Sequence, residues 1–271
     1  MPLVAVAHGS RDPRSAATVG QLTQVVRALR PGVDARAAFL DLSEPRLGEV
    51  LEAVYQAGDR RAVVVPLLLS RAHHAKVDVP AMVADACRRL PGLAVTISGV
   101  LGPDPRLESA ALRKLAATGV PPVDPEVGVV LAGAGSSHPR ANRTVATLAR
   151  RWEAESGWAG VEEAFASAGG PDLPDAVARL HARGARRIAV ASWFLAPGLL
   201  PDRISALARQ ADPDALIAEP IGADPEVAEL VLHRYDGARR RVGTPRAVES
   251  GPVVACRRRI MTTSARSLVV S

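Results

Sequence analysis

The chain has 271 residues, enough for two domains of about 100–150 residues each. Hydrophobic residues make up 48% of it and aromatic residues only 3%, so the core is expected to consist mainly of aliphatic side chains. It contains no run of about 18 apolar residues, which argues against a membrane span. Its first residues lack the pattern of a signal peptide, and two cysteines make no disulfide framework, so we expect a cytoplasmic protein.

The net charge of +6 is confined to the end of the chain. Residues 236–271 contain eight arginines and two acidic residues, which leaves residues 1–235 with no net charge. This basic stretch has no clear period and is broken by glycine and proline, so we expect a disordered tail. An arm for an anionic partner is the alternative. The globular part gives no sign of binding nucleic acid.

Short apolar strands alternate with amphipathic helices along the chain. In the first half we predict strands at 3–7, 35–40, 62–69 and 94–100, and helices at 15–29, 44–57, 79–90 and 105–117. In the second half we predict strands at 127–132, 161–166, 187–195 and 215–220, and helices at 142–155, 172–182, 202–210 and 226–233. Ser43 and Pro45 are expected to open the helix at 44–57. This alternation predicts an α/β fold with two similar doubly wound parallel-sheet domains, at 1–118 and 126–235.

The second domain is a degenerate copy of the first. Gly9-Ser10 recurs as Gly135-Ser136, an offset of 126 residues. The same offset relates Pro13 to Pro139, Arg14 to Arg140, Phe39 to Phe165, Pro45 to Pro171 and Gly58 to Gly184. Two similar α/β domains imply a pseudo-two-fold axis and a cleft between them.

Three side chains of the first copy follow predicted strands. His8 follows the first strand, Asp41 the second and His74 the third. Parallel strands place such residues at one edge of the sheet, where open α/β sheets bind ligands. Imidazoles bind iron, cobalt, nickel or zinc, so we predict that His8 and His74 hold a metal, with Asp41 as a further ligand or a base.

The second copy has lost this chemistry. Ala134 stands at the position of His8, and Ser167 at that of Asp41. The position of His74 falls at Leu200 or, with a slip of one residue, at Pro201. We therefore expect one functional site in each chain.

Cationic and glycine-rich segments lie near the predicted cleft. Guanidinium groups bind carboxylates in a bidentate manner, and glycines at a helix start let backbone amides approach an anion. The loop at 133–137 is too short for a nucleotide-binding Walker motif. The residues predicted to bind substrate are Ser10, Arg11, Arg71, Lys76, Gly135 and Ser136.

Several motifs together resemble the sirohydrochlorin chelatases, the ATP-independent class II chelatases. They are His8-Gly9-Ser10-Arg11-Asp12-Pro13, Phe39-Leu40-Asp41, Pro66-Leu67-Leu68-Leu69 leading to His74-x-Lys76-x-Asp78-x-Pro80, and Gly102-Pro103-Asp104-Pro105. The resemblance covers roughly residues 2–235. It is to the long form, in which two repeats are fused and the catalytic histidines lie in the first.

The resemblance implies an enzyme that inserts Co²⁺ or Fe²⁺ into sirohydrochlorin, in cobalamin or siroheme biosynthesis. His8 and His74 would then be the metal-binding and catalytic residues, and Asp41 stands where the family usually has Glu. No cofactor beyond the substrate metal is implied. The partners would be the tetrapyrrole and the metal, without a membrane or nucleic acid. A monomer would suffice, since one chain supplies both halves of the cleft.

Other functions use some of the same residues. A non-catalytic metal or tetrapyrrole carrier would need the same ligands. A histidine phosphatase would begin with Arg-His-Gly after the first strand, but this chain has Ala7-His8-Gly9 with an arginine at position 11. A nucleic-acid module would rest on the basic tail alone.

Overall fold

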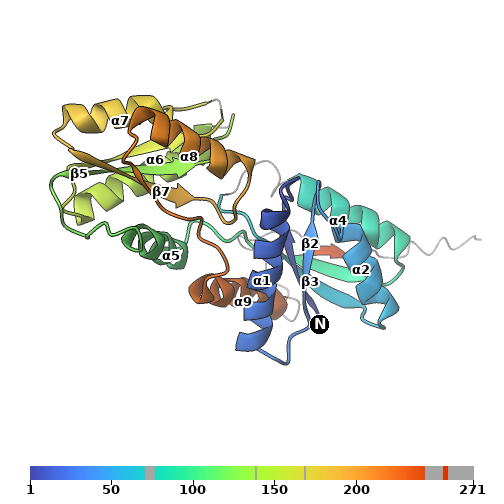
Figure 1. Ribbon diagram of the computed structural model, residues 1–271. Coiled ribbons are helices and arrows are strands. Elements are labelled where there is room, and N and C mark those ends of the chain that lie inside the picture. Colours follow the sequence, from blue (N-terminus) through green and yellow to red (C-terminus); the bar gives the residue numbers. More distant parts are fainter. Residues whose placement is uncertain (71–76, 138, 168, 242–252, 256–271) are drawn as a thin grey trace, which may run out of the picture.

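The computed structural model describes residues 1–70, 77–137, 139–167, 169–241 and 253–255. It has two halves of the same topology, each a parallel sheet with helices on both faces (Figure 1). The prediction of two similar doubly wound α/β units is therefore confirmed. Within the described residues, no helix is both long and apolar enough to cross a membrane.

The two sheets share one strand order. The four parallel strands of the first sheet have the order β2 (Ala35–Phe39), β1 (Leu3–Ala7), β3 (Arg61–Pro66), β4 (Ala94–Ile97). The second has the order β6 (Gly160–Phe165), β5 (Val127–Gly133), β7 (Arg187–Trp193), β8 (Leu216–Ile217). All of these pairs are parallel, with Ala5 opposite both Ala37 and Val65, and Val130 opposite both Glu162 and Val190. The repeat in the sequence is thus a repeat of the fold.

Eight helices are described. They are α1 (Pro13–Leu29), α2 (Leu47–Gln56), α4 (Asp78–Arg89), α5 (Pro105–Ala116), α6 (Pro139–Glu155), α7 (Leu173–Ala182), α8 (Leu199–Ala211) and α9 (Pro225–Arg241). Asp12 and Asp104 begin α1 and α5 by accepting hydrogen bonds from the main-chain N–H groups of Arg14 and Arg106. In both helices proline follows the cap, where its missing N–H costs nothing.

Many predicted boundaries differ from the observed ones; the helices predicted from 142 and 202, for example, begin at Pro139 and Leu199. Two further differences are informative. The helix expected at 44–57 begins only at Leu47, because the Ser43 hydroxyl bonds to the main chain of Ser10 instead of capping a helix. Part of the tail expected to be disordered is ordered. Helix α9 continues to Arg241, and Val253–Ala255 form strand β9, which pairs antiparallel with β4.

The last helix of each repeat packs on the sheet of the other repeat. Helix α9 lies beside α1 and covers β3 and β4, whereas α5 packs against β7 (Figure 1). One apolar cluster therefore runs through both halves, from Leu3 and Leu22 to Leu131 and Tyr235. The clusters on the two outer faces each belong to one half. The two repeats therefore share one hydrophobic core cluster, although they are separate units in the sequence.

Arg234 of α9 joins the two halves through main-chain contacts. Its guanidinium donates hydrogen bonds to the carbonyls of Val100 and Leu101, both at 2.9 Å, and pairs with Asp104 at 3.2 Å. We expect Arg234→Ala to lower the free energy of unfolding by about 2 kcal/mol, because charged hydrogen bonds are lost and the carbonyls of Val100 and Leu101 lose this donor. Urea unfolding measures this change. Arg88→Ala, at an exposed ion pair on α4, is the control and should cost less than about 1 kcal/mol. Equal losses would contradict the role of Arg234.

Candidate active site

His8 and Asp41 lie in adjacent loops at the carboxyl edge of the first sheet. The N–H of Asp41 donates to the His8 carbonyl at 2.8 Å, and the N–H of Leu40 donates to that of Ala7 at 3.0 Å. These bonds continue the β1–β2 pairing beyond the strands. Gly9 has φ +96°, and a Cβ there would lie 1.6 Å from the Asp41 carbonyl oxygen. The backbones of the two loops are therefore in direct contact.

The Asp41 carboxylate is exposed but paired. It accepts hydrogen bonds from the Arg46 guanidinium at 2.6 Å and from the N–H of Leu42 at 2.9 Å. The Arg46 hydrogen bond is the main cause that lowers the pKa of Asp41, followed by the Leu42 bond, and a charge on His8 acts in the same direction. A base works best with a pKa near the working pH. Asp41 is thus suited to hold a negative charge beside His8 and is a weak proton acceptor.

Removing the partner of Asp41 should reverse this shift. We expect Arg46→Gln to raise the pKa of Asp41 toward that of an ordinary aspartate, so that the carboxylate stays ionised over a narrower range at low pH. Carbon-detected NMR titration of the Asp41 carboxyl group measures the change. Arg88→Gln should leave this pKa unchanged. An unshifted Asp41 in Arg46→Gln would mean that the pair does not form in solution.

Ser10 is tied into the same corner. Its N–H donates to the Ser43 hydroxyl at 3.0 Å, which in turn donates to the Ser10 carbonyl at 2.8 Å. The Ser10 hydroxyl accepts from the N–H of Asp12 at 3.1 Å. Arg11, next in the chain, is exposed. The loop is fixed by its own polar contacts, and its substrate-binding role stays a prediction.

The second predicted histidine lies outside the described residues. His74, together with Arg71 and Lys76, falls in the segment 71–76 between β3 and α4. Strand β3, which ends at Pro66, pairs directly with β1, which ends just before His8. In the described part of the chain, no three His, Cys, Asp or Glu side chains are grouped to hold a metal. The pairing of His8 with His74 remains a prediction.

In the second half, the corresponding corner is closed by a structural hydrogen bond. Ser167, the counterpart of Asp41, donates from its hydroxyl to the carbonyl of Ala134, the counterpart of His8, at 2.6 Å. Gly135 has φ +80°, and a Cβ there would lie 2.8 Å from the Ser167 hydroxyl. The Ser136 carbonyl accepts from the Asn142 amide at 2.9 Å. The loop keeps the backbone geometry of the first half without its imidazole and carboxylate.

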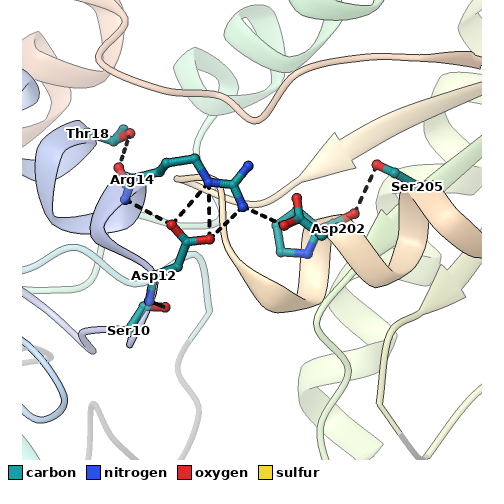
Figure 2. Close-up of polar contacts among 7 residues, drawn as sticks. Ser10, Asp12, Arg14, Thr18, Asp202 and Ser205 are labelled. Carbon is teal, nitrogen blue, oxygen red and sulfur yellow. Dashed lines mark hydrogen bonds and ion pairs between the residues drawn. The ribbon is translucent and has the colours of Figure 1, made fainter.

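The two halves meet at the starts of α1 and α8. Arg14 binds Asp12 through two nitrogens and extends to Asp202 on α8 (Figure 2). Nearby, a Cβ on Gly198 would lie 3.6 Å from the Ser10 hydroxyl. The β7–α8 loop of the second half therefore lies against the His8 loop of the first.

A cavity of about 410 Å³ lies at this junction and is lined mainly by the second half. Its polar lining residues are Arg14, Ser192, Asp202, Ser205, Arg209 and Glu219. Arg14 brings the first half to its wall, so a ligand in the cavity would touch both repeats.

Comparison with known proteins identifies the family. The family model described as CbiX matches residues 2–118 and again 128–238, which is both repeats. The chain belongs to the CbiX family.

Characterised relatives of this CbiX chain are similar over most of its length. A sirohydrochlorin ferrochelatase of Priestia megaterium is 26% identical over 235 residues, which is 84% of this chain and 87% of that protein. A sirohydrochlorin cobaltochelatase of the same organism is 24% identical over 211 residues, which is 76% of this chain and 67% of that protein. The solved structure of SirB from Bacillus subtilis with Fe³⁺ has a TM-score of 0.71 at 25% identity, covering 90% of this chain and 98% of that one. The resemblance found in the sequence motifs is confirmed.

Several residues at the CbiX site gave no signal in the sequence. Arg46 lies five residues after Asp41, but no local pattern pairs an arginine with an acid at that spacing in a loop. Asp202 lies 188 residues from Arg14 along the chain. It stands at the repeat position of Lys76, so comparing the two repeats identifies the position but not its partner.

Proposed function

We propose that the protein is a chelatase that inserts Co²⁺ or Fe²⁺ into sirohydrochlorin without ATP. The observation that carries this proposal is the match of the family model to both repeats. His8 lies at the carboxyl edge of the first sheet, directly after β1. Relatives named for both metals are similar over most of the chain. The residues predicted to act are His8, His74 and Asp41.

The proposed chemistry divides the work among these side chains. A neutral imidazole binds either metal, so His8 and His74 hold the incoming ion. Two pyrrole N–H protons must leave as the metal enters. Because Arg46 lowers the pKa of Asp41, and a base works best with a pKa near the working pH, we assign the accepting role to a histidine instead of Asp41. Asp41 then stabilises the positive charge that collects beside it.

The choice of metal sets the pathway. Imidazole and carboxylate groups suit both Co²⁺ and Fe²⁺, so the proposal covers cobalamin and siroheme synthesis alike. It places the reaction in the cytoplasm, with the metal as substrate and no further cofactor. The proposal also includes a monomer as the active form, since α5 and α9 of one chain already join its two sheets.

The test is an absorbance assay without oxygen and without ATP. Sirohydrochlorin is mixed with Co²⁺ or Fe²⁺, with and without the protein, and the spectral change on metal insertion is followed. We expect faster conversion with the protein, and the ratio of the two rates ranks the metals. A saturable spectral shift of the tetrapyrrole without faster insertion would identify a carrier instead. No effect on the tetrapyrrole would refute both functions.

A further inference from the structure

Several exposed apolar side chains lie in the segments that follow strands. Within the described residues, the large hydrophobic side chains that are exposed are Leu29, Leu42, Val77, Leu112, Val123, Leu199 and Leu200. Four of these seven follow the carboxyl end of a strand. Leu42 follows β2, Val77 precedes α4 after β3, and Leu199 and Leu200 begin α8 after β7. Apolar surface in water is unfavourable, so its concentration at the ligand-binding edge of both sheets indicates a ligand with an apolar face.

The first turn of α8 is held beside the predicted metal site. Leu199 is 68% exposed and Leu200 is 40% exposed. Gly198, the residue before them, approaches the Ser10 hydroxyl, and Asp202, three residues after Leu199, is bound by Arg14 of α1 (Figure 2). The two leucines thus lie between two contacts with the first half. Their exposure belongs to a fixed part of the junction.

The repeat in the sequence aligns this turn with a predicted metal ligand of the first half. At the offset of 126 residues, the position of His74 falls at Leu200 or, with a slip of one residue, at Pro201. In the sequence, the second half therefore has an apolar residue where the first half has an imidazole. If Leu200 were buried, packing in the core would explain why this position is apolar. Leu200 is exposed, so packing does not explain it.

A cation accompanies the apolar turn. Arg203 follows Leu199 by four residues and Leu200 by three, the two spacings that put side chains on one face of a helix. Arg203 is exposed. An apolar patch with a guanidinium at its margin matches a flat, conjugated ring that carries carboxylate arms.

We propose that Leu199 and Leu200 form a platform for one face of the tetrapyrrole ring, and that Arg203 binds a carboxylate on its rim. This inference rests on the proposed function and extends it. The first half supplies the metal ligands, and the second half supplies the platform against which the ring lies. The degenerate repeat thus has a binding role in place of the lost one.

The test measures ring binding apart from metal insertion. Sirohydrochlorin is titrated into the full-length protein without metal, and the dissociation constant is read from the absorbance change. We expect Leu199→Ser with Leu200→Ser to weaken binding by about tenfold or more, since two apolar contacts with the ring are lost. In the insertion assay KM should rise by a similar factor, with kcat changed far less. Leu199→Met with Leu200→Met should retain binding.

Matched controls separate this effect from a general loss of apolar surface. Leu29→Ser and Val123→Ser change residues that are 46% and 70% exposed, far from the junction, and should leave binding unchanged. Arg203→Gln should weaken binding, and the difference from wild type should shrink as salt is added.

The outcomes distinguish the platform from the function itself. If the wild type inserts metal and the leucine variants bind the ring as tightly as it does, the platform is refuted and the chelatase stands. If the wild type neither binds the ring nor inserts metal, the proposed function fails and the platform fails with it. If kcat falls while the dissociation constant is unchanged, the leucines act on catalysis and the platform is refuted.

Discussion

His8→Ala is expected to reduce the rate of metal insertion by about 10²–10⁴-fold, the range for losing a positioned catalytic side chain. The backbone of His8 is fixed by the bond from Asp41, and Gly9 holds the turn that follows. Deleting the imidazole would therefore remove the proposed metal ligand and proton acceptor while the backbone contacts of the loop stay in place. His74→Ala should have an effect of the same order, because one remaining imidazole cannot hold the ion in the same way. Initial rates of the anaerobic absorbance assay measure both losses.

A third histidine serves as the control for this prediction. His233 is exposed on α9, so His233→Ala should keep the wild-type rate. Circular dichroism should show that all three variants are folded. A folded His8→Ala variant with the wild-type rate would remove His8 from the mechanism, whatever the family of the chain.

Gly9→Ala is expected to have the largest effect on stability, lowering the free energy of unfolding by more than about 3 kcal/mol. Two causes add. The φ of +96° is unfavourable for alanine, and its Cβ would lie 1.6 Å from the main-chain oxygen of Asp41. The atom in the way belongs to the backbone of an adjacent loop, so it cannot move aside as a flexible side chain can. The two loops would have to separate, which would also displace His8.

Gly58→Ala distinguishes the two causes. Gly58 has almost the same φ, +94°, but a Cβ there would meet nothing within 4 Å. This variant should lose only about 1 kcal/mol, the cost of the backbone conformation alone. Urea unfolding of both variants measures the difference, which is the cost of the collision. If the two losses were equal, the close contact of the His8 and Asp41 loops would not exist in solution.

Much of the fold could be predicted from the sequence. The alternating pattern located all the strands of both repeats, and the offset of 126 residues predicted the repeated topology. The exchange of α5 and α9 could not be predicted, because a helix with an apolar face has the same pattern whichever sheet it covers. The start of α2 was missed for a similar reason. Ser43 has the chemistry of a cap, but a contact with Ser10, 33 residues earlier, uses its hydroxyl.

The candidate site likewise has features that the sequence predicts and features that only the structure shows. The sequence predicted that His8 and Asp41 lie at the carboxyl edge of the sheet, because both follow parallel strands. Their contact depends on β1 and β2 being neighbours, which only the structure shows. The electrostatics of Asp41 did not follow, because they depend on the direction in which Arg46 extends from a loop. The contact of Arg14 with Asp202 depends on how the two halves are placed, which no local pattern encodes.

Because α5 and α9 each pack on the sheet of the other repeat, the chain could be produced as two separate fragments that assemble. A break in the exposed linker between Pro122 and Val123 would give two fragments, each lacking the helix that covers its own sheet. Alone, each fragment would expose apolar surface on its sheet and on the helix that packs on the sheet of the other fragment. Produced together, each would supply the helix that the other lacks. The chain is therefore a candidate for a split enzyme, in which insertion activity reports that two separately encoded fragments have met.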